Sequence, residues 1–387
     1  MSLRTLLTLS ITLSSTLLAG CNCNGTTYDP SQVAPLADDF GKYLSMDVAP
    51  GGRPVIAYYN VSQGAVGFAV GTVTHDGGVL WAHERVDGFA DAGGLDTGNL
   101  GQYTAMKVAK DGSVWLAYQA GDALKVAHRV DGAWTTEQAD VGASGSQCGR
   151  WNSLALDADD SPVIAHYDEG KGNLRVARRA GGSWTSSNVW NGEDFTPPPD
   201  ANGQTATRPA NVGKFADLSI VNGIEYITAY DAAAQRLVLL EGPAGSYAQS
   251  IVYQDPGSEV GLWPSLWTDG MAVAISFEDR SRGQLMFAER TSPTGAFNVS
   301  PIDTAPRVGA DSELLYTEAG FQVLYFDTEN NDMKRARALN ESWITESIGG
   351  EDGAVGFFNE AAAADGRYFA ASYDYTHRTV FFRELDA

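Results

Sequence analysis

A chain of 387 residues with 43% apolar and 19% charged residues can bury a large core, which excludes an intrinsically disordered protein. Its formal net charge of −22 repels phosphate backbones and anionic lipid, so nucleic-acid binding is not expected. The chain has 43 glycines and no helical spacing of Leu, Ala, Glu and Lys beyond the N-terminus. This composition indicates many short strands joined by turns.

The N-terminus carries a short apolar run over residues 6–18, too short to span a bilayer as a helix. The segment Leu18-Ala19-Gly20-Cys21 that follows resembles the lipobox of bacterial lipoproteins. The resemblance implies a signal peptide at 1–20, lipid on Cys21 and a tether at 21–27, so that the protein is anchored rather than spanning. An ordinary secretory signal with a chance cysteine is the alternative. Asn22, in place of Asp, favours the outer over the inner membrane.

The three cysteines leave one pairing open. If Cys21 carries lipid, only Cys23 and Cys148 remain. Export to an oxidising compartment would permit a disulfide between them. Two free thiols are the alternative, because two cysteines form no framework pattern.

A glycine followed two residues later by an aromatic recurs along the chain. The clearest copies are Gly149-Arg150-Trp151 and Gly261-Leu262-Trp263, while Gly309-Ala310-Asp311 keeps the glycine and loses the aromatic. The seven repeat glycines are Gly41, Gly101, Gly149, Gly213, Gly261, Gly309 and Gly356. Their spacing is near 48 residues with two insertions, and such a period with strand-like content is typical of propeller blades.

Each repeat predicts four antiparallel strands. In the third repeat the first strand is Ser153-Leu154-Ala155-Leu156, and the second ends in Ile164-Ala165-His166-Tyr167-Asp168. The third strand contains Leu174-Arg175-Val176-Ala177, and Trp184 opens the fourth. The inner strands lack strict alternation, as expected where neighbouring blades cover both faces of a sheet. The predicted fold is therefore all-β, a seven-bladed β-propeller with four-stranded blades.

The last blade is predicted to be completed by the N-terminal segment. In repeats two to six the fourth-strand aromatic follows the glycine by 33 to 36 residues, which for repeat seven falls beyond Ala387. Tyr28 precedes Gly41 by 13 residues, an interval that matches the regular blades. The segment around 28–36 is therefore expected to close the ring as the missing outer strand, giving one domain over 28–387. A solenoid of the same repeats is the weaker alternative.

The repeats resemble those of bacterial seven-bladed propellers of the sialidase-like or Asp-box group. The turn Val130-Asp131-Gly132-Ala133-Trp134 is similar to a degenerate Asp-box, whereas Gly181-Gly182-Ser183-Trp184 keeps only the glycine and the aromatic. The resemblance covers about residues 28–387 and implies the fold. The Ser and Thr of the motif are missing, and no Arg-Ile-Pro segment is present, so it does not imply sialidase activity.

One face of the propeller is expected to gather the candidate site. The link into the first strand and the turn after the second strand lie on the same face of a blade, so the aromatics and the strand-end Asp residues would surround one channel mouth. Asp168 and Asp279 belong to that Asp set. The structural alternatives are that the Asp side chains cap turns and that the aromatics pack the blades.

Positions where one blade departs from the others are the stronger candidates. His166 replaces a Tyr, and Glu313 and Glu360 occupy positions that other repeats fill with small residues. Aromatic rings stack on pyranose faces and carboxylates accept bonds from hydroxyls, so such a set suits a sugar. A solvated rim is the alternative for each residue. The predicted ligand-binding residues are Arg150, Trp151, His166, Asp168, Trp263, Asp279, Glu313 and Glu360.

The link from Asn191 to Val212 is 16 residues longer than usual and contains Pro197-Pro198-Pro199. A loop of this length is either functional or mobile. Two alternatives are open for this link: a lid or partner-recognition loop over the channel mouth, or an exposed linker.

Signatures of catalysis are mostly missing from the sequence. There is no His or Cys cluster for a transition metal and no phosphate-binding loop, while acidic turns such as Asp159-Asp160 could bind Ca²⁺. The predicted function is an envelope-anchored binding module for a glycan or a protein partner at the channel mouth. One alternative is a glycoside hydrolase or polysaccharide lyase, which needs two or more carboxylates, or an Arg with a Tyr or His, in one pocket. Side chains of Glu278, Glu313 and Glu360 that all splay outward would contradict it. Another is a structural component of an envelope complex.

Overall fold

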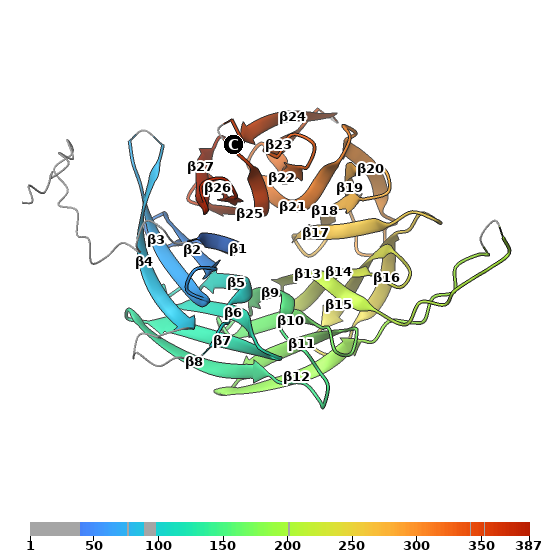
Figure 1. Cartoon of the computed structure of the whole chain (residues 1–387), viewed down its shortest axis with the longest axis horizontal. Helices are drawn as coiled ribbons and strands as arrows, with labels where there is room; N and C mark the ends of the chain where they lie inside the picture. Colours follow the sequence, from blue (N-terminus) through green and yellow to red (C-terminus); the bar gives the residue numbers. More distant parts are fainter. Residues whose placement is uncertain (1–38, 76, 89–97, 200–201, 341, 352) are drawn as a thin grey trace, which may run out of the picture.

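Seven antiparallel sheets form a ring around a central channel in the computed structural model (Figure 1). The structure describes residues 39–387 except 76, 89–97, 200–201, 341 and 352. Within these residues there is no α-helix, and hence none that could cross a membrane. The predicted all-β, seven-bladed propeller is confirmed.

The first six blades have four strands each, and the seventh has three in the described part of the chain. The strands of blades one to four are β1 (Phe40–Ala49), β2 (Arg53–Asn60), β3 (Ala65–Val73), β4 (Val79–Gly88), β5 (Gln102–Val108), β6 (Val114–Ala120), β7 (Ala123–Val130), β8 (Ala133–Asp140), β9 (Arg150–Leu156), β10 (Pro162–Asp168), β11 (Asn173–Ala180), β12 (Ser183–Trp190), β13 (Val212–Val221), β14 (Ile224–Asp231), β15 (Arg236–Pro243) and β16 (Ala248–Tyr253). Blades five to seven contain β17 (Val260–Thr268), β18 (Val273–Asp279), β19 (Gln284–Arg290), β20 (Asn298–Asp303), β21 (Val308–Thr317), β22 (Gly320–Asp327), β23 (Asp332–Leu339), β24 (Ser342–Gly349), β25 (Val355–Ala364), β26 (Arg367–Asp374) and β27 (Thr379–Leu385).

In every blade the strands pair in chain order, with the first strand nearest the channel. The turn of the degenerate Asp-box, Asp131-Gly132, joins β7 to β8, and both residues have positive φ, 48° and 82°. This conformation is the two-residue hairpin turn that matches strand twist. The segment 28–36, predicted to add a fourth strand to the last blade, lies outside the described residues.

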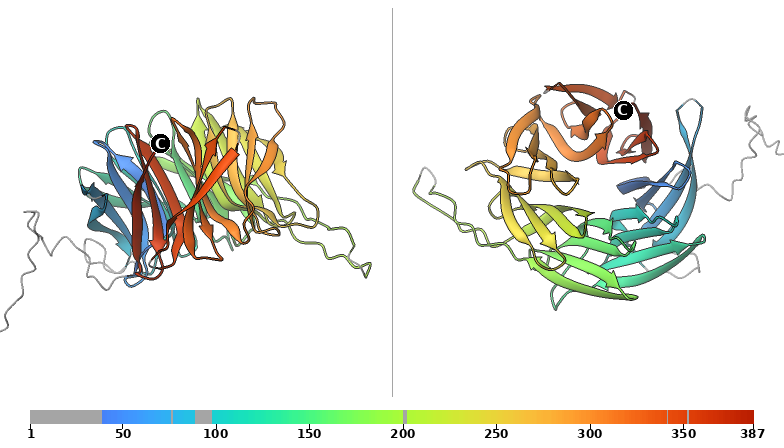
Figure 2. Two further views of the ribbon diagram at one scale, coloured as in Figure 1. Left: turned by 90° about the horizontal axis from the view of Figure 1, so that it is seen from above. Right: turned by 180° about the vertical axis from the view of Figure 1, so that it is seen from behind.

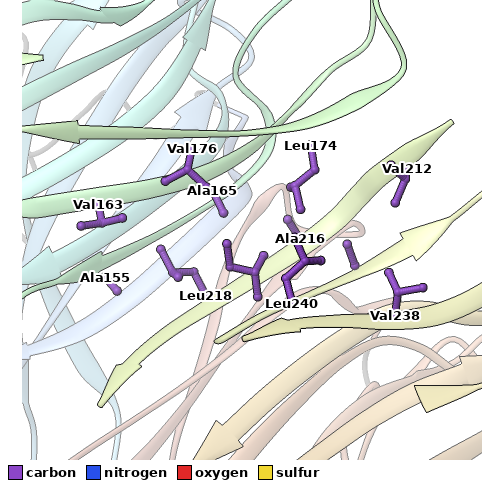
Figure 3. Packing of buried hydrophobic residues seen from close by; sticks show 12 residues of the cluster. Ala155, Val163, Ala165, Leu174, Val176, Val212, Ala216, Leu218, Val238 and Leu240 are labelled. Atoms are coloured by element: carbon purple, nitrogen blue, oxygen red, sulfur yellow. The ribbon is translucent and has the colours of Figure 1, made fainter. Parts of the chain in front are cut away.

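The hydrophobic core lies between adjacent blades. Figure 3 shows one such layer, in which Val163 and Val176 of blade three pack with Leu218 and Leu240 of blade four. All seven residues of β10 are buried, because neighbouring blades cover both of its faces. A polar residue on such a strand must therefore find its partners inside the protein.

Blade seven meets blade one through the same contacts that join other neighbouring blades. Met46 and Phe369 belong to one buried cluster. The Tyr373 hydroxyl donates to Asp39 Oδ1 at 2.5 Å, as Tyr167 donates to Asn211 Oδ1 at 2.9 Å between blades three and four. The ring is thus closed by a repeated inter-blade hydrogen bond.

The long link between β12 and β13 forms an antiparallel arm. Phe195 and Arg208 exchange backbone hydrogen bonds of 2.9 and 2.8 Å. The arm extends outward from the rim of the ring and away from the channel (Figures 1 and 2). It is therefore an exposed projection, and the alternative of a lid over the channel mouth is wrong.

Candidate functional site

The channel mouth is built by a bulge at the start of each blade's first strand. At this point the repeat glycine has positive φ, for example 90° at Gly261, and the residue two places later does as well. These second residues lie at φ 42–55° in all seven blades and are Tyr43, Tyr103, Trp151, Phe215, Trp263, Asp311 and Phe358. Bulky residues rarely adopt this conformation, and a bulge redirects the side chain that it carries. Here all seven side chains line the channel.

Six of the seven residues form a continuous arc of aromatic rings, called here the collar. The distances between neighbouring ring centroids are 4.8 Å for Phe358–Tyr43, 4.7 Å for Tyr43–Tyr103, 5.2 Å for Tyr103–Trp151, 5.1 Å for Trp151–Phe215 and 4.1 Å for Phe215–Trp263. These separations lie at or slightly below the short end of the range typical of stabilising aromatic pairs. Asp311 fills the seventh position, between Trp263 and Phe358. The mouth is therefore ringed by six aromatic side chains, two of which carry a hydroxyl group, and by one carboxyl group.

The side chain after a collar residue often fixes the neighbouring blade. Ser312 Oγ donates to the Trp263 carbonyl at 2.7 Å, and Asn359 Nδ2 donates to the Asp311 carbonyl at 2.9 Å. Thr104 bonds the Tyr43 carbonyl in the same way. These bonds hold the collar backbone in place, so the collar is organised without a ligand.

Below the collar lies a cavity of about 410 Å³. The residues four places after the repeat glycines, called here the polar ring, are Ser45, Ala105, Ser153, Asp217, Ser265, Glu313 and Glu360, and all of them except Ser265 line this cavity. Lys107, two positions further along β5, also lines the cavity. An aromatic collar over a polar floor is the usual composition of a small-molecule site.

Most polar-ring side chains satisfy the backbone of the next blade. The first strand of each blade is a sheet edge, and its N–H groups facing the channel need acceptors. Asp217 Oδ2 accepts from Leu266 N at 2.8 Å, and Glu360 Oε2 accepts from Met46 N at 3.2 Å. Serines do the same elsewhere, as when Ser265 Oγ accepts from Leu314 N at 2.9 Å.

Glu313 differs from the other two acids of the polar ring. Its Oε2 accepts from Ser265 Oγ at 3.0 Å, and no backbone N–H in the described part of the chain donates to it. Lys107 likewise makes no hydrogen bond or ion pair with the residues that the structure describes. These two charged groups are therefore not required to complete the sheet edges, and they remain available to a ligand.

Three carboxyl groups of the channel have pKa values above their usual range. Burial, with the charges of Glu360 and Asp217, raises the pKa of Glu313 well above its usual value. Burial also raises the pKa of Glu360 to about 8 and that of Asp311 to about 7. The Glu313–Glu360 pair therefore holds a proton at neutral pH and can both donate and accept hydrogen bonds.

Lys107 stays charged although it lies inside the channel. Burial opposes its charged form, but the surrounding carboxylates outweigh this effect and raise its pKa. Asp47 contributes most to this increase, followed by Glu360 and Glu313. The cavity thus combines an ammonium group, a carboxylic acid and carboxylate acceptors beneath aromatic rings.

The structure brings together four of the eight predicted ligand-binding residues. Trp151, Trp263, Glu313 and Glu360 all line the cavity. Arg150 lies outside it and forms an ion pair with Glu169, Nη1 to Oε2 at 2.6 Å.

The predicted role of Asp168 and Asp279 in the mouth is corrected. Both side chains are fully buried away from the cavity. Asp168 Oδ1 accepts from Gln147 N at 2.7 Å, and Asp279 Oδ1 accepts from Arg282 N at 2.9 Å. These carboxylates cap loops and turns, the structural alternative weighed for the strand-end Asp set. Glu278 also lies outside the cavity wall and bonds Arg280 at 3.2 Å.

The prediction for His166 is also corrected, because this residue belongs to a buried hydrogen-bond network between blades two and three. Its Nε2 bonds Asp140 Oδ2 at 3.1 Å, and Gly149 N donates to its Nδ1 at 3.2 Å. Arg175 donates to both oxygens of Asp140, Nε to Oδ2 at 2.7 Å and Nη2 to Oδ1 at 3.0 Å. Tyr325 takes the equivalent place between blades five and six, where its hydroxyl bonds Asp303 at 2.7 Å.

Asp140, Cys148 and His166 place three potential metal ligands within 4.8 Å of one another. The donor set does not fit a metal, since both ring nitrogens of His166 are already engaged and Arg175 covers the carboxylate. Cys148 is a free, buried thiol, and burial raises its pKa to about 12, so it stays protonated. Cys23, its predicted partner in a disulfide, lies outside the described residues.

Sequence reasoning missed Lys107 and Asp217. A signal existed, because Asp217, Glu313 and Glu360 are the three acids at the fourth position after the repeat glycine, where other repeats have Ser or Ala. Lys107 stands two places beyond that position in its repeat. Which of the acids completes a sheet edge depends on contacts between blades, which the sequence does not contain.

Comparison with known proteins supports the fold. No family model and no curated protein matches the sequence. Hydrazine synthase of Kuenenia stuttgartiensis is 11% identical with a TM-score of 0.57, covering 93% of this chain and 99% of that chain. Polysaccharide lyase Uly1 is 8% identical with a TM-score of 0.55, covering 95% and 94%. The fucose-recognising Aleuria aurantia lectin, a six-bladed propeller, is 13% identical with a TM-score of 0.48, covering 80% and 95%. The two structures with TM-scores above 0.5 support the propeller architecture and, at this identity, nothing beyond it.

Proposed function

We propose that this protein is a glycan-binding module whose site is the collar and the cavity beneath it. The observation that carries the proposal is the arc of six aromatic rings over a floor of hydrogen-bonding groups. Pyranose rings offer apolar faces that stack on aromatic rings and hydroxyl groups that both donate and accept. The protonated Glu313–Glu360 pair supplies both kinds of partner for those hydroxyls.

We expect Trp151→Ala and Trp263→Ala each to weaken glycan binding by roughly tenfold or more, since each removes a stacking surface at the centre of the site. The measurement is a glycan and polysaccharide array probed with the purified full-length chain, followed by titration calorimetry of the best ligand. Runs with Ca²⁺ and with EDTA test whether a bound calcium ion contributes to glycan binding. Trp184→Ala on the outer strand β12 is the matched control and should bind as wild type does. Absence of glycan binding in both conditions would reject the proposal and favour a protein partner.

A second candidate function is cleavage of the bound glycan. The observation that favours it is the presence of two electrostatically coupled carboxyl groups, Glu313 and Glu360, in one cavity. A protonated acid beside a carboxylate is the pair that glycoside hydrolysis requires. The same titrations answer this question, since chromatography of the recovered ligand would show shortened products if turnover occurs.

We further propose that the module is held at the cell envelope by lipid on Cys21, in the outer rather than the inner membrane. The support for this is the Leu18-Ala19-Gly20-Cys21 segment and the absence of Asp at position 22. Cys21→Ser should abolish membrane fractionation and globomycin-sensitive processing, because the thiol that accepts the lipid is gone. Membrane retention of the Cys21→Ser protein would contradict lipid anchoring.

A further inference from the structure

We propose that this channel site selects a sugar bearing a free, protonated amine over the acetylated or hydroxylated form of the same sugar. The inference rests on the proposed glycan binding and names the ligand class for it. It is argued from the aromatic collar, from the charged groups inside the cavity and from Glu313, the acid of the polar ring that accepts no backbone N–H in the described part of the chain.

The channel carries more acidic than basic groups. Glu313, Glu360 and Asp217 belong to the polar ring, and Asp311 stands among the collar residues. Asp47 acts on Lys107 from the first blade. Against these five carboxyl groups Lys107 is the one basic side chain on the cavity wall among the described residues. A cation in the cavity is attracted by these carboxyl groups as they ionise, whereas a neutral ligand is not.

Most of these acids already have structural roles. Asp47 Oδ2 accepts from Val108 N at 2.8 Å, Asp217 and Glu360 accept from inner-strand N–H groups, and Asp311 accepts from Phe358 N. Glu313 accepts only from a serine hydroxyl in the described part of the chain. Because no sheet edge depends on it, Glu313 is the acid available to meet an ammonium group of a ligand.

The collar favours the same chemistry. The faces of aromatic rings attract cations, as one lysine shows on a collar ring and another on Tyr373, which lies outside the collar. Lys214 Nζ lies 5.7 Å from the centre of the Trp151 ring, and Lys42 Nζ lies 5.3 Å from that of Tyr373. An amino sugar would present its apolar face to the collar and its ammonium group to the acids below.

An ammonium ligand would also change the protonation of the Glu313–Glu360 pair. Burial and neighbouring carboxylates raise the pKa of Glu313 and of Glu360, so the free pair keeps a proton. A cation beside the pair lowers both pKa values and releases that proton. A neutral sugar has no such effect, which makes proton release a signature specific to the amine.

The test compares three trisaccharides with the same β-1,4 backbone: the glucosamine trimer, its N-acetylated form and cellotriose. Titration calorimetry of the full-length chain at about pH 6, where the sugar amines are already mostly protonated, is repeated in buffers of different ionisation enthalpy and gives the affinity and the number of protons released. We expect the glucosamine trimer to bind on the order of tenfold more tightly than cellotriose, with proton release that the other two lack.

Glu313→Gln should remove most of the preference, measured as the ratio of the glucosamine-trimer and cellotriose affinities of the same variant, because the amide keeps the shape without the charge. Glu318→Gln, an exposed position of the same blade, changes net charge equally and should leave the preference intact. Lys107→Met should increase the preference, because the competing ammonium is removed from the cavity.

The outcomes separate this inference from the proposed function. Equal binding of all three trimers, or an amine preference that Glu313→Gln and Glu318→Gln reduce alike, would overturn the amine selectivity and leave glycan binding in place. Binding of none of the trimers while 1,4-diaminobutane binds would overturn the assignment to sugars.

Discussion

An Asp140→Asn protein should be about 3 kcal/mol less stable to unfolding than the wild type. The carboxylate of Asp140 is almost completely buried and accepts two hydrogen bonds from the Arg175 guanidinium, at 2.7 and 3.0 Å. The amide removes the negative charge and leaves a buried cation without its counter-ion. Urea unfolding followed by tryptophan fluorescence measures the difference in the free energy of unfolding.

The control for this prediction lies on the same two strands. Glu137 on β8 pairs with Arg179 on β11 at 3.0 Å, but both side chains are about one-third exposed. Because solvent screens such a pair, Glu137→Gln should change the free energy of unfolding by less than about 1 kcal/mol. Equal losses in the two variants would show that burial of the Asp140–Arg175 pair is not what stabilises this part of the ring.

The same network predicts the direction of a pH effect. Burial alone would raise the pKa of Asp140, but the hydrogen bonds from His166 and Arg175 outweigh it and lower that pKa. A depressed carboxyl pKa contributes stability that is complete above the unfolded value of about 4 and is lost as the pH falls below it. The stability gap between wild type and Asp140→Asn should therefore narrow on acidification below pH 4.

The fold could be predicted from the sequence because the signal is repeated seven times. The Gly-x-aromatic pattern marks a bulge that every blade needs, and its period fixes the number of blades. Trp151 and Trp263 could be placed at the mouth for the same reason, since position in the repeat determines position in the ring. The predicted outer strand of the last blade at 28–36 falls outside the described residues and stays a prediction.

The site could be predicted only in part, because departure from a repeat has two physical causes. His166 stands where other repeats have Tyr, and it forms a buried hydrogen bond with Asp140. Glu313 stands where other repeats have Ser or Ala, and it faces the cavity. His166 lies on a second strand, which is covered on both faces, and Glu313 lies on a first strand, whose inner edge faces the channel. The position of a strand within its blade therefore separates structural from functional departures better than residue type does.

Gly261→Ala should be destabilised by about 3 kcal/mol and should also disorder the collar. A Cβ at this position would lie 2.6 Å from Leu237 N and 2.7 Å from Leu237 Cα in the neighbouring blade. Those are backbone atoms of a central strand, so they cannot yield by rotating a side chain. The positive φ of 90° adds strain of its own for an alanine. Thermal unfolding measures the first effect, and near-UV circular dichroism of the tryptophans measures the second.

Gly257→Ala separates close packing from backbone strain. Gly257 has a similar φ of 85°, but nothing lies within 4 Å of the Cβ that it would acquire. This variant should lose only about 1 kcal/mol and keep the near-UV spectrum and the glycan affinity of the wild type. If the two variants behave alike, the close approach of blades at the repeat glycine has no role in holding the collar. If only Gly261→Ala changes the near-UV spectrum and weakens glycan binding, the close contact between blades at the repeat glycine also shapes the site. The reason is that Trp263 of the collar lies only two residues after Gly261.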